Sequence, residues 1–251
     1  MRALCFQVCG LFREQRDARS RTSQVVELER HQAARFVKRA IAISLCATFA
    51  VIPNHYPGRQ GDSHAYLTRL EREIVAEHNL ARSDPASYAV FLRDLKPHFD
   101  GRQFSVSDTV VRMTQEGTAA VDEAIEFLES TASVPDLRAS QGMSLGARDL
   151  VRDQGPRGST GHVGSDGSQP WDRVARYGDW QGEIAENVAY GFDTARNVVV
   201  QLIIDDGVRG RGHRVNIFKP EFRVVGVSCG NHDRYGTVCV MTYAVGYVEN
   251  R

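Results

Sequence analysis

Two histidines lie in glycine-rich segments where they could take part in chemistry. His162 lies in "TGHVGSDG" and His213 lies in "GRGHR". Glycine neighbours let the backbone approach closely, so the two imidazoles could be directed into a shared space. An imidazole titrates near neutral pH and is also a common metal ligand. His162 and His213 are therefore our candidates for acid–base chemistry and for binding zinc or another divalent cation.

Acidic residues accompany the histidines. Glu183 and Glu186 lie between them in "GEIAENVAYG", and Asp205 and Asp206 end the apolar run "QLIIDDG". Two imidazoles and two carboxylates that meet in one cleft would suit a metal ion or proton transfer. Neither HExxH nor a paired CxxC is present, however, so the spacing alone is a weak signal for a metal. The absence of G-x-S-x-G also argues against a serine nucleophile.

Simpler interpretations compete with this one. Either histidine, taken alone, is well explained by a structural hydrogen bond. Glu186 could be a loop acid that accepts from backbone N–H groups. The two aspartates could pair with basic residues of the following loop, in surface contacts that contribute little to stability. Those basic residues are Arg209, Arg211 and Arg214.

The aspartates raise a question of their own, because they follow a predicted helix. Thr194 is its expected N-cap and Gly207 its expected stop. Its apolar stripe continues to Asp205 and Asp206, at the end of the buried face. An acid at a helix C-terminus is disfavoured by about 0.3–1 kcal/mol, so a nearby positive charge or metal ion is expected. The stripe consists of Ala195, Val198, Val199, Leu202 and Ile203.

The remaining elements follow from periodicity. "AYLTRLEREIVAEHNLARSDP" is expected to be helical, and Ser83 or Asp84 would cap a second helix. Further helices are expected over 118–131, after a Ser144 cap, and from Pro170. A loop is expected over 156–169, and a long loop that leaves room for one short strand over 101–117. The inward face of the first helix should comprise Leu67, Leu70, Ile74, Val75 and Leu80.

Near the C-terminus the period changes to two. "FRVVGVSC" and "YGTVCVMTYAVGYV" alternate around the turn "GNHDR". Pairing Cys229 with Cys239 across the hairpin also places Val225, Val227, Met241 and Tyr243 on the same face, so this register buries the apolar set and allows a disulfide. Helices followed by a late antiparallel sheet predict an α+β domain over residues 63–251.

The first 62 residues form a basic tail. An apolar run over residues 40–52 follows Arg35, Lys38 and Arg39, and it is too short to cross a bilayer comfortably. It is typical of a signal peptide cleaved after Ala50; a short membrane anchor or a buried N-terminal helix are the alternatives. The formal net charge of the chain is zero, which gives no indication of nucleic-acid binding.

Five segments together resemble the CAP superfamily (cysteine-rich secretory, antigen 5 and pathogenesis-related 1 proteins), also called SCP-domain proteins. They are "EHNLARSDPASYA", "TGHVGSDG…PWDRVARYG", "GEIAENVAYG", "DDGVRGRGHRVNIFKPEFRVVGVSCG" and "YGTVCVMTYA", within about residues 70–248. The "GHR-x-N" form looks most like the bacterial-type branch. The resemblance implies an α-β-α sandwich with a central antiparallel sheet flanked by helices.

The resemblance also implies a cleft tetrad of two histidines and two acids. By motif these are His162, Glu186, His213 and Asp205, with Asp206 as the alternative second acid. Aspartate stands where the family usually has glutamate, and the C-terminal "C-x-Y-x-P-x-G-N" signature is absent. Details specific to the eukaryotic branch are therefore not carried over.

For function, the resemblance implies a secreted, non-enzymatic binding or signalling module. The expected partners are a lipid or sterol in the cleft or a cell-surface protein, and no nucleic acid. The alternative is a metal- or His/Glu-dependent hydrolase, similar to a peptidase, in which His162, Glu186 and His213 would position a water molecule.

Overall fold

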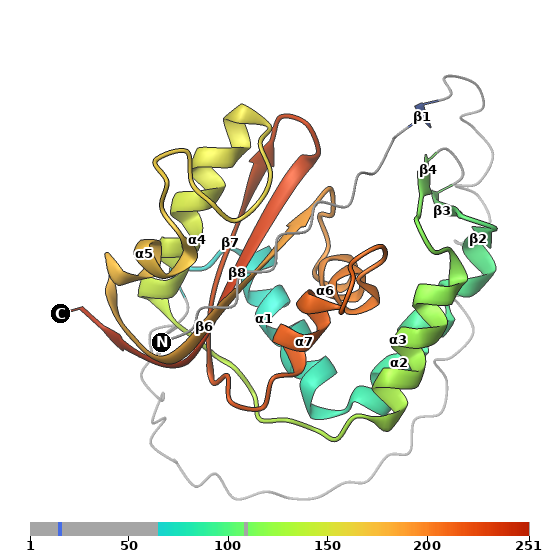
Figure 1. Cartoon of the computed structure of the whole chain (residues 1–251), viewed down its shortest axis with the longest axis horizontal. Helices are drawn as coiled ribbons and strands as arrows, with labels where there is room; N and C mark the ends of the chain where they lie inside the picture. The colour runs from blue at the N-terminus through green and yellow to red at the C-terminus, as the bar shows by residue number, and fades with distance from the viewer. Residues whose placement is uncertain (1–14, 17–64, 108–109, 251) are drawn as a thin grey trace, which may run out of the picture. The chain divides into compact units, whose positions relative to one another are not determined.

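A computed structural model describes residues 15–16, 65–107 and 110–250 of the chain (Figure 1). The apolar run over 40–52 lies outside these residues, so its role as signal peptide or anchor stays a prediction. Within the described residues, no helix combines the length and the apolar character needed to cross a membrane. The two-residue strand β1 (Gln15–Arg16) precedes the domain.

The centre of the domain is a sheet with the strand order β5-β7-β8-β6. Its three long strands, β6 (Gly178–Tyr190), β7 (Val224–His232) and β8 (Gly236–Glu249), are antiparallel. The two-residue strand β5 (Arg138–Ala139) pairs with β7 in the parallel sense. The predicted antiparallel sheet is therefore present, with a short parallel strand at one edge and β6 at the other.

Helices cover both faces of this sheet (Figure 1). One face carries α4 (Gln141–Gln154) and α5 (Pro170–Ala175). The opposite face carries α1 (Arg69–Ser83), α6 (Ala195–Ile204) and α7 (Gly212–Phe218). Alternate residues of β7 and β8 belong to different core clusters accordingly. The α+β class and the α-β-α sandwich are confirmed.

The β7–β8 hairpin has the predicted register. Cys229 lies opposite Cys239, Val227 opposite Met241, and Val225 opposite Tyr243. The two cysteines form a disulfide, with their Cα atoms 4.1 Å apart. All six side chains pack in or against a single core cluster. Alternation of apolar residues about a polar turn therefore fixed both the strand pairing and the buried face.

The N-terminal helices depart from their predicted packing. Asp84 caps α2 (Pro85–Arg93) as expected, through its bond from the Ser87 amide. In α1, however, Leu80 is 45% exposed while Arg82 is fully buried. The Arg82 guanidinium donates to the carbonyls of Pro135, Ile217, Lys219 and Phe222, which makes its burial tolerable. An apolar stripe read from the sequence does not reveal such a residue.

The start of α4 and its packing also differ from expectation. Ser140 caps this helix, one turn before the predicted cap Ser144. Ser144 instead accepts a hydrogen bond from the Val227 amide on β7, at 3.0 Å. This approach requires glycine at position 226, because a Cβ there would lie 2.2 Å from the Met143 carbonyl carbon.

The segment over 101–117, predicted as a long loop with room for one short strand, contains a β-hairpin. Strands β2 (Phe99–Asp100), β3 (Gln103–Ser107) and β4 (Val110–Met113) pair antiparallel in chain order. The hairpin follows the short helix η1 (Lys96–His98) and precedes α3 (Thr118–Ser130). Like η1, η2 (Gly155–Arg157) is a 3-10 helix, and it lies at the end of α4.

Candidate functional site

The first predicted pair, His162 and Glu186, is formed and buried. His162 Nδ1 lies 3.1 Å from Glu186 Oε1, and the two side chains are 5% and 1% exposed. A third residue, Arg173 on α5, donates from Nη2 to both Glu186 oxygens, at 3.0 and 2.8 Å. Its Nη1 donates to the carbonyls of His162 and Ser168. Arg173 therefore neutralises a buried carboxylate and holds the histidine loop in place.

The second pair, His213 and Asp205, is formed with Asp205 as the acid. Asp205 Oδ1 lies 2.6 Å from His213 Nδ1, and Oδ2 accepts the His213 backbone N–H at 2.9 Å. Asp205 is the C-cap of α6 and has the left-handed φ of 56°, which aspartate tolerates better than most residues. This conformation turns the carboxylate toward the start of α7.

Two arginines supply the positive charge that is expected beside the acids at the end of α6. The Arg214 guanidinium donates to the Ile203 and Ile204 carbonyls, and Arg211 Nη1 donates to the Asp205 carbonyl at 2.8 Å. Positive charge thus lies against the negative end of the helix. The two arginines bind backbone carbonyls at this end of α6, whereas Asp205 binds His213.

Asp206, the alternative acid, has a different role. Its carboxylate accepts from the backbone N–H groups of Gln115 and Glu116, at 2.7 and 2.8 Å. Glu116 in turn accepts from the Gly207 amide at 2.6 Å and from Arg211. Arg211 lowers the pKa of Glu116 to about 2. We call this reciprocal set of contacts, made by Asp206, Glu116 and Arg211, the clasp.

The two histidine pairs contact opposite faces of the edge strand β6. Glu186 and Asn187 are neighbours on this strand, so their side chains point to opposite faces. Glu186 contacts His162, whereas Asn187 Nδ2 donates to the His213 carbonyl at 3.0 Å. Asn216 Nδ2 donates to Asn187 Oδ1 at 2.8 Å. The asparagine of "GHR-x-N" therefore anchors α7 to β6.

This polar network extends into the core through His78. His78 Nδ1 bonds the Ile74 carbonyl and its Nε2 bonds the Tyr243 hydroxyl, each at 2.8 Å. Because a carbonyl only accepts, Nδ1 carries the proton and the hydroxyl donates to Nε2. Tyr243 also accepts from Asn187. Complete burial lowers the pKa of His78 to about 4.

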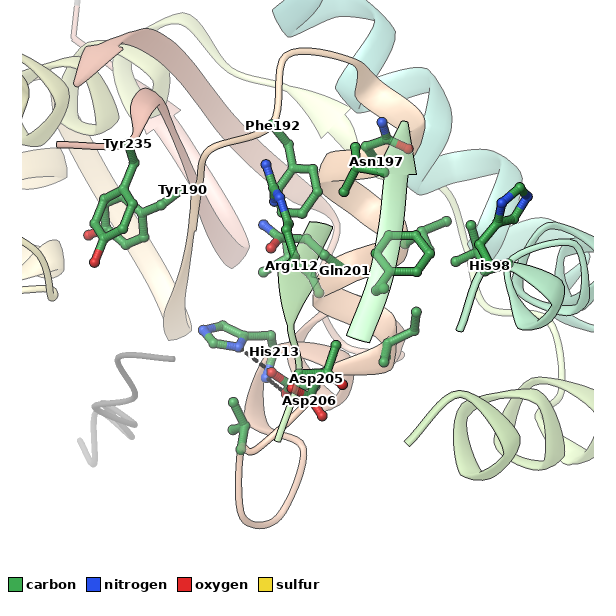
Figure 2. Close-up of a pocket in the computed structure, with 18 of the residues that line it drawn as sticks. His98, Arg112, Tyr190, Phe192, Asn197, Gln201, Asp205, Asp206, His213 and Tyr235 are labelled. Atoms are coloured by element: carbon green, nitrogen blue, oxygen red, sulfur yellow. Dashed lines mark hydrogen bonds and ion pairs between the residues drawn. The ribbon is translucent and has the colours of Figure 1, made fainter. Parts of the chain in front are cut away.

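A mostly apolar pocket of about 270 Å³ opens beside the second pair (Figure 2). His213, Asp205 and Asp206 line one end of it, whereas His162 and Glu186 are not among its lining residues. The β2–β4 hairpin contributes one wall, and the end of β6 with α6 contributes the other. Apolar lining residues include Leu95, Phe99, Phe104, Phe192, Leu202 and Ile204.

The donor atoms do not make the three-ligand set of a catalytic zinc site. Each imidazole has Nδ1 on a carboxylate, which would leave Nε2 for a metal. Both Glu186 oxygens, however, are bonded to Arg173, and both Asp205 oxygens to His213. Across the described ranges, no group of three or more His, Cys, Asp or Glu side chains is placed to hold a metal ion. We therefore derive no step through a metal.

The sequence pattern does not predict Arg173 or Asn187 as site residues, whereas Glu183, which it does suggest, pairs with another residue. Glu183, considered with Glu186, instead forms an ion pair with Lys219 at 2.5 Å. The sequence does not predict a role for Arg173, because an arginine in a short helix is usually a surface residue. Its position three residues after Pro170, on the inner face of α5, is the available signal. Asn187 lies in "ENVAYG", a motif that does not by itself indicate the bond from Asn187 to the His213 carbonyl.

The chain also matches a known protein family. The model of the cysteine-rich secretory protein (CAP) family matches residues 75–243, so this chain belongs to the CAP family. No curated protein matches the chain. The solved structures it resembles include two bacterial proteins.

One is an outer surface protein from Borrelia burgdorferi, with 15% identity and a TM-score of 0.38 over 44% of this chain and 78% of that one. The other is an extracellular SCP-domain protein from Bacillus anthracis, with 19% identity and a TM-score of 0.34, over 44% of this chain and 34% of that one. This chain therefore spans about a third of the Bacillus protein.

Proposed function

We propose that this CAP domain is an exported, non-enzymatic binding module whose pocket takes an apolar, lipid-like ligand. The supporting observation is the pocket itself, whose mostly apolar lining of aromatic and aliphatic side chains also includes polar groups such as His213 and Asp205. Small-molecule sites usually combine an apolar lining with a few placed polar groups.

The size of the pocket favours a slender ligand. Its volume of about 270 Å³ lies just below the range of about 300–1,000 Å³ typical of small-molecule sites. A methylene group occupies about the volume of a water molecule, roughly 30 Å³, so a chain of about nine carbons would fill it. A single alkyl chain fits this space better than a sterol ring system.

Export is supported by two features. The basic lead and apolar run over residues 40–52 have the composition of a signal peptide. The Cys229–Cys239 disulfide is typical of proteins that fold in an oxidising compartment. Mass spectrometry of the exported chain would give the mature N-terminus; a product that still begins at Met1 would contradict cleavage.

Binding can be tested with a neutral fluorescent probe, N-phenyl-1-naphthylamine. Val200→Trp should fill the pocket and weaken saturable probe binding at least tenfold, because Val200 lines it. Val90→Trp is the matched control, since Val90 is an exposed valine of another helix, α2. Equal binding by both variants, or no saturable binding by the wild type, would contradict the proposal.

The hydrolase alternative now depends on His213 alone. Glu186 is held by Arg173 through both oxygens, so it is a poor general base. His213, oriented by Asp205 and lining the pocket, is better placed for proton transfer. Turnover of ester or peptide libraries that His213→Ala abolishes would replace the binding proposal with this one.

A further inference from the structure

At one end of the pocket, contacts within the protein determine which ring nitrogen of His213 donates a hydrogen bond and which accepts one. Asp205 is 3% exposed, and its two oxygens take the Nδ1 and the backbone N–H of His213. An ionised carboxylate only accepts hydrogen bonds, so the imidazole must carry a proton on Nδ1. In the neutral ring, Nε2 is then an acceptor.

The accepting nitrogen faces away from its carboxylate. Figure 2 shows one ring nitrogen of His213 directed at Asp205 and the other directed away from it. Within the part of the chain that the structure describes, no residue hydrogen-bonds to Nε2 of His213. His213 lines the pocket, so a ligand at this end would lie beside the ring that carries this lone pair.

From this geometry we infer the chemical class of the ligand, an inference that rests on the proposed function. The ligand is an apolar chain that ends in a hydrogen-bond donor, in the simplest case an alcohol, whose hydroxyl donates to His213 Nε2. The hydroxyl would satisfy an acceptor that the described residues leave unbonded, and the chain would lie against apolar side chains of the lining, which include Phe99, Phe104 and Phe192.

Charge at the same end disfavours a carboxylate head group. Asp205 and Asp206 both line the pocket, so an anion beside His213 would approach two negative charges. The opposing positive group is Arg112, which also lines the pocket, lies 3.9 Å from the Phe192 ring centroid and donates to the Gly191 carbonyl. An anionic ligand would therefore be selected by Arg112 and a hydroxyl by His213, which makes the two distinguishable.

The test compares three ten-carbon compounds as competitors of N-phenyl-1-naphthylamine at pH 8.5, above the ordinary histidine range. They are 1-decanol, which donates; 2-decanone, which only accepts; and decanoate, which is anionic. The wild-type chain should bind decanol about three- to tenfold more tightly than the other two, which is the usual effect of one hydrogen bond.

Two variants separate the head-group contact from the apolar contacts. In Asp205→Asn the His213 backbone N–H would still occupy the side-chain oxygen, so the amide NH₂ would donate to Nδ1 and Nε2 would carry the proton. Decanone should then bind as tightly as decanol or more tightly. His213→Phe should keep binding of all three compounds but lose the preference. His98→Phe, at another imidazole of the pocket lining, should retain the preference.

Equal affinities in the wild type, tighter binding of decanoate, or a preference for decanol that persists in His213→Phe would each overturn the inference while leaving the binding module intact. Failure of all three compounds to displace the probe from the wild type would instead overturn the proposed pocket, and this inference with it.

Discussion

Acid should weaken the folded domain through one buried histidine, His78. Its ordinary pKa is about 6.5 and its pKa in the fold is about 4, because burial penalises the charged form. Between these two pH values the unfolded chain binds a proton that the folded chain does not. The free energy of unfolding therefore falls as the pH falls below about 6.5.

The size of this effect follows from the shift. The difference of about 2.5 between the two pKa values corresponds to a limiting loss of about 3.4 kcal/mol well below pH 4, at about 1.36 kcal/mol per unit. At pH 5.0 about 2 kcal/mol should already be lost. Other groups also titrate in this range, so the informative quantity is the difference in stability between the wild type and His78→Gln, which cannot gain this proton.

The assay is urea unfolding followed by tryptophan fluorescence at several pH values from 7.5 to 5.0. The stability advantage of the wild type over His78→Gln should shrink by about 2 kcal/mol across this range. His98→Gln, a change of an exposed histidine, should show a constant difference. A constant difference for His78→Gln as well would refute the reasoning from burial.

Three further changes are expected to have defined outcomes. Arg173→Met should destabilise the fold by about 3–5 kcal/mol because Glu186 would keep a buried, unpaired charge; Glu186→Gln in addition should recover part of the loss in urea unfolding, and the exposed Arg176→Met should cost below about 1 kcal/mol. Replacing Cys229 and Cys239 by serine should lower stability by about 2–3 kcal/mol, the effect expected for a loop closed over a separation of 10 residues; equal unfolding midpoints with and without reductant in the wild type would contradict this. In zinc titration calorimetry, the wild type and His162→Ala/His213→Ala should bind equally weakly, since the carboxylates are occupied; a tight site present only in the wild type would restore the two-histidine metal site.

The sequence predicted the β7–β8 hairpin in register but missed strand β6. In the hairpin, a two-residue alternation and a polar turn point to the same pairing. In β6, residues 184–189 are all buried, because helices cover both faces of the sheet, and alternation therefore disappears. A register shift between Gln181 and Ile184 further breaks the pattern.

Most of the candidate site could be predicted because glycine-flanked histidines and family motifs mark it. The choice of Asp205 over Asp206 could not, since it depends on a left-handed backbone conformation at the end of α6. Arg173 could not be found by composition either, because its burial depends on Glu186 of β6 lying opposite it. Pairwise contacts between distant segments were the missing information.

The clasp ties two parts of the pocket together. Asp206 and Glu116 connect the base of the β2–β4 hairpin to the loop that carries Asp205 and His213, and Arg211 completes the connection with further ion pairs to Glu123. The hairpin wall of the pocket and the loop that carries His213 are thus linked through these contacts. Among relatives, positions 116, 123 and 211 should consequently vary together, and substitutions there should alter the ligand selectivity that we propose for the pocket.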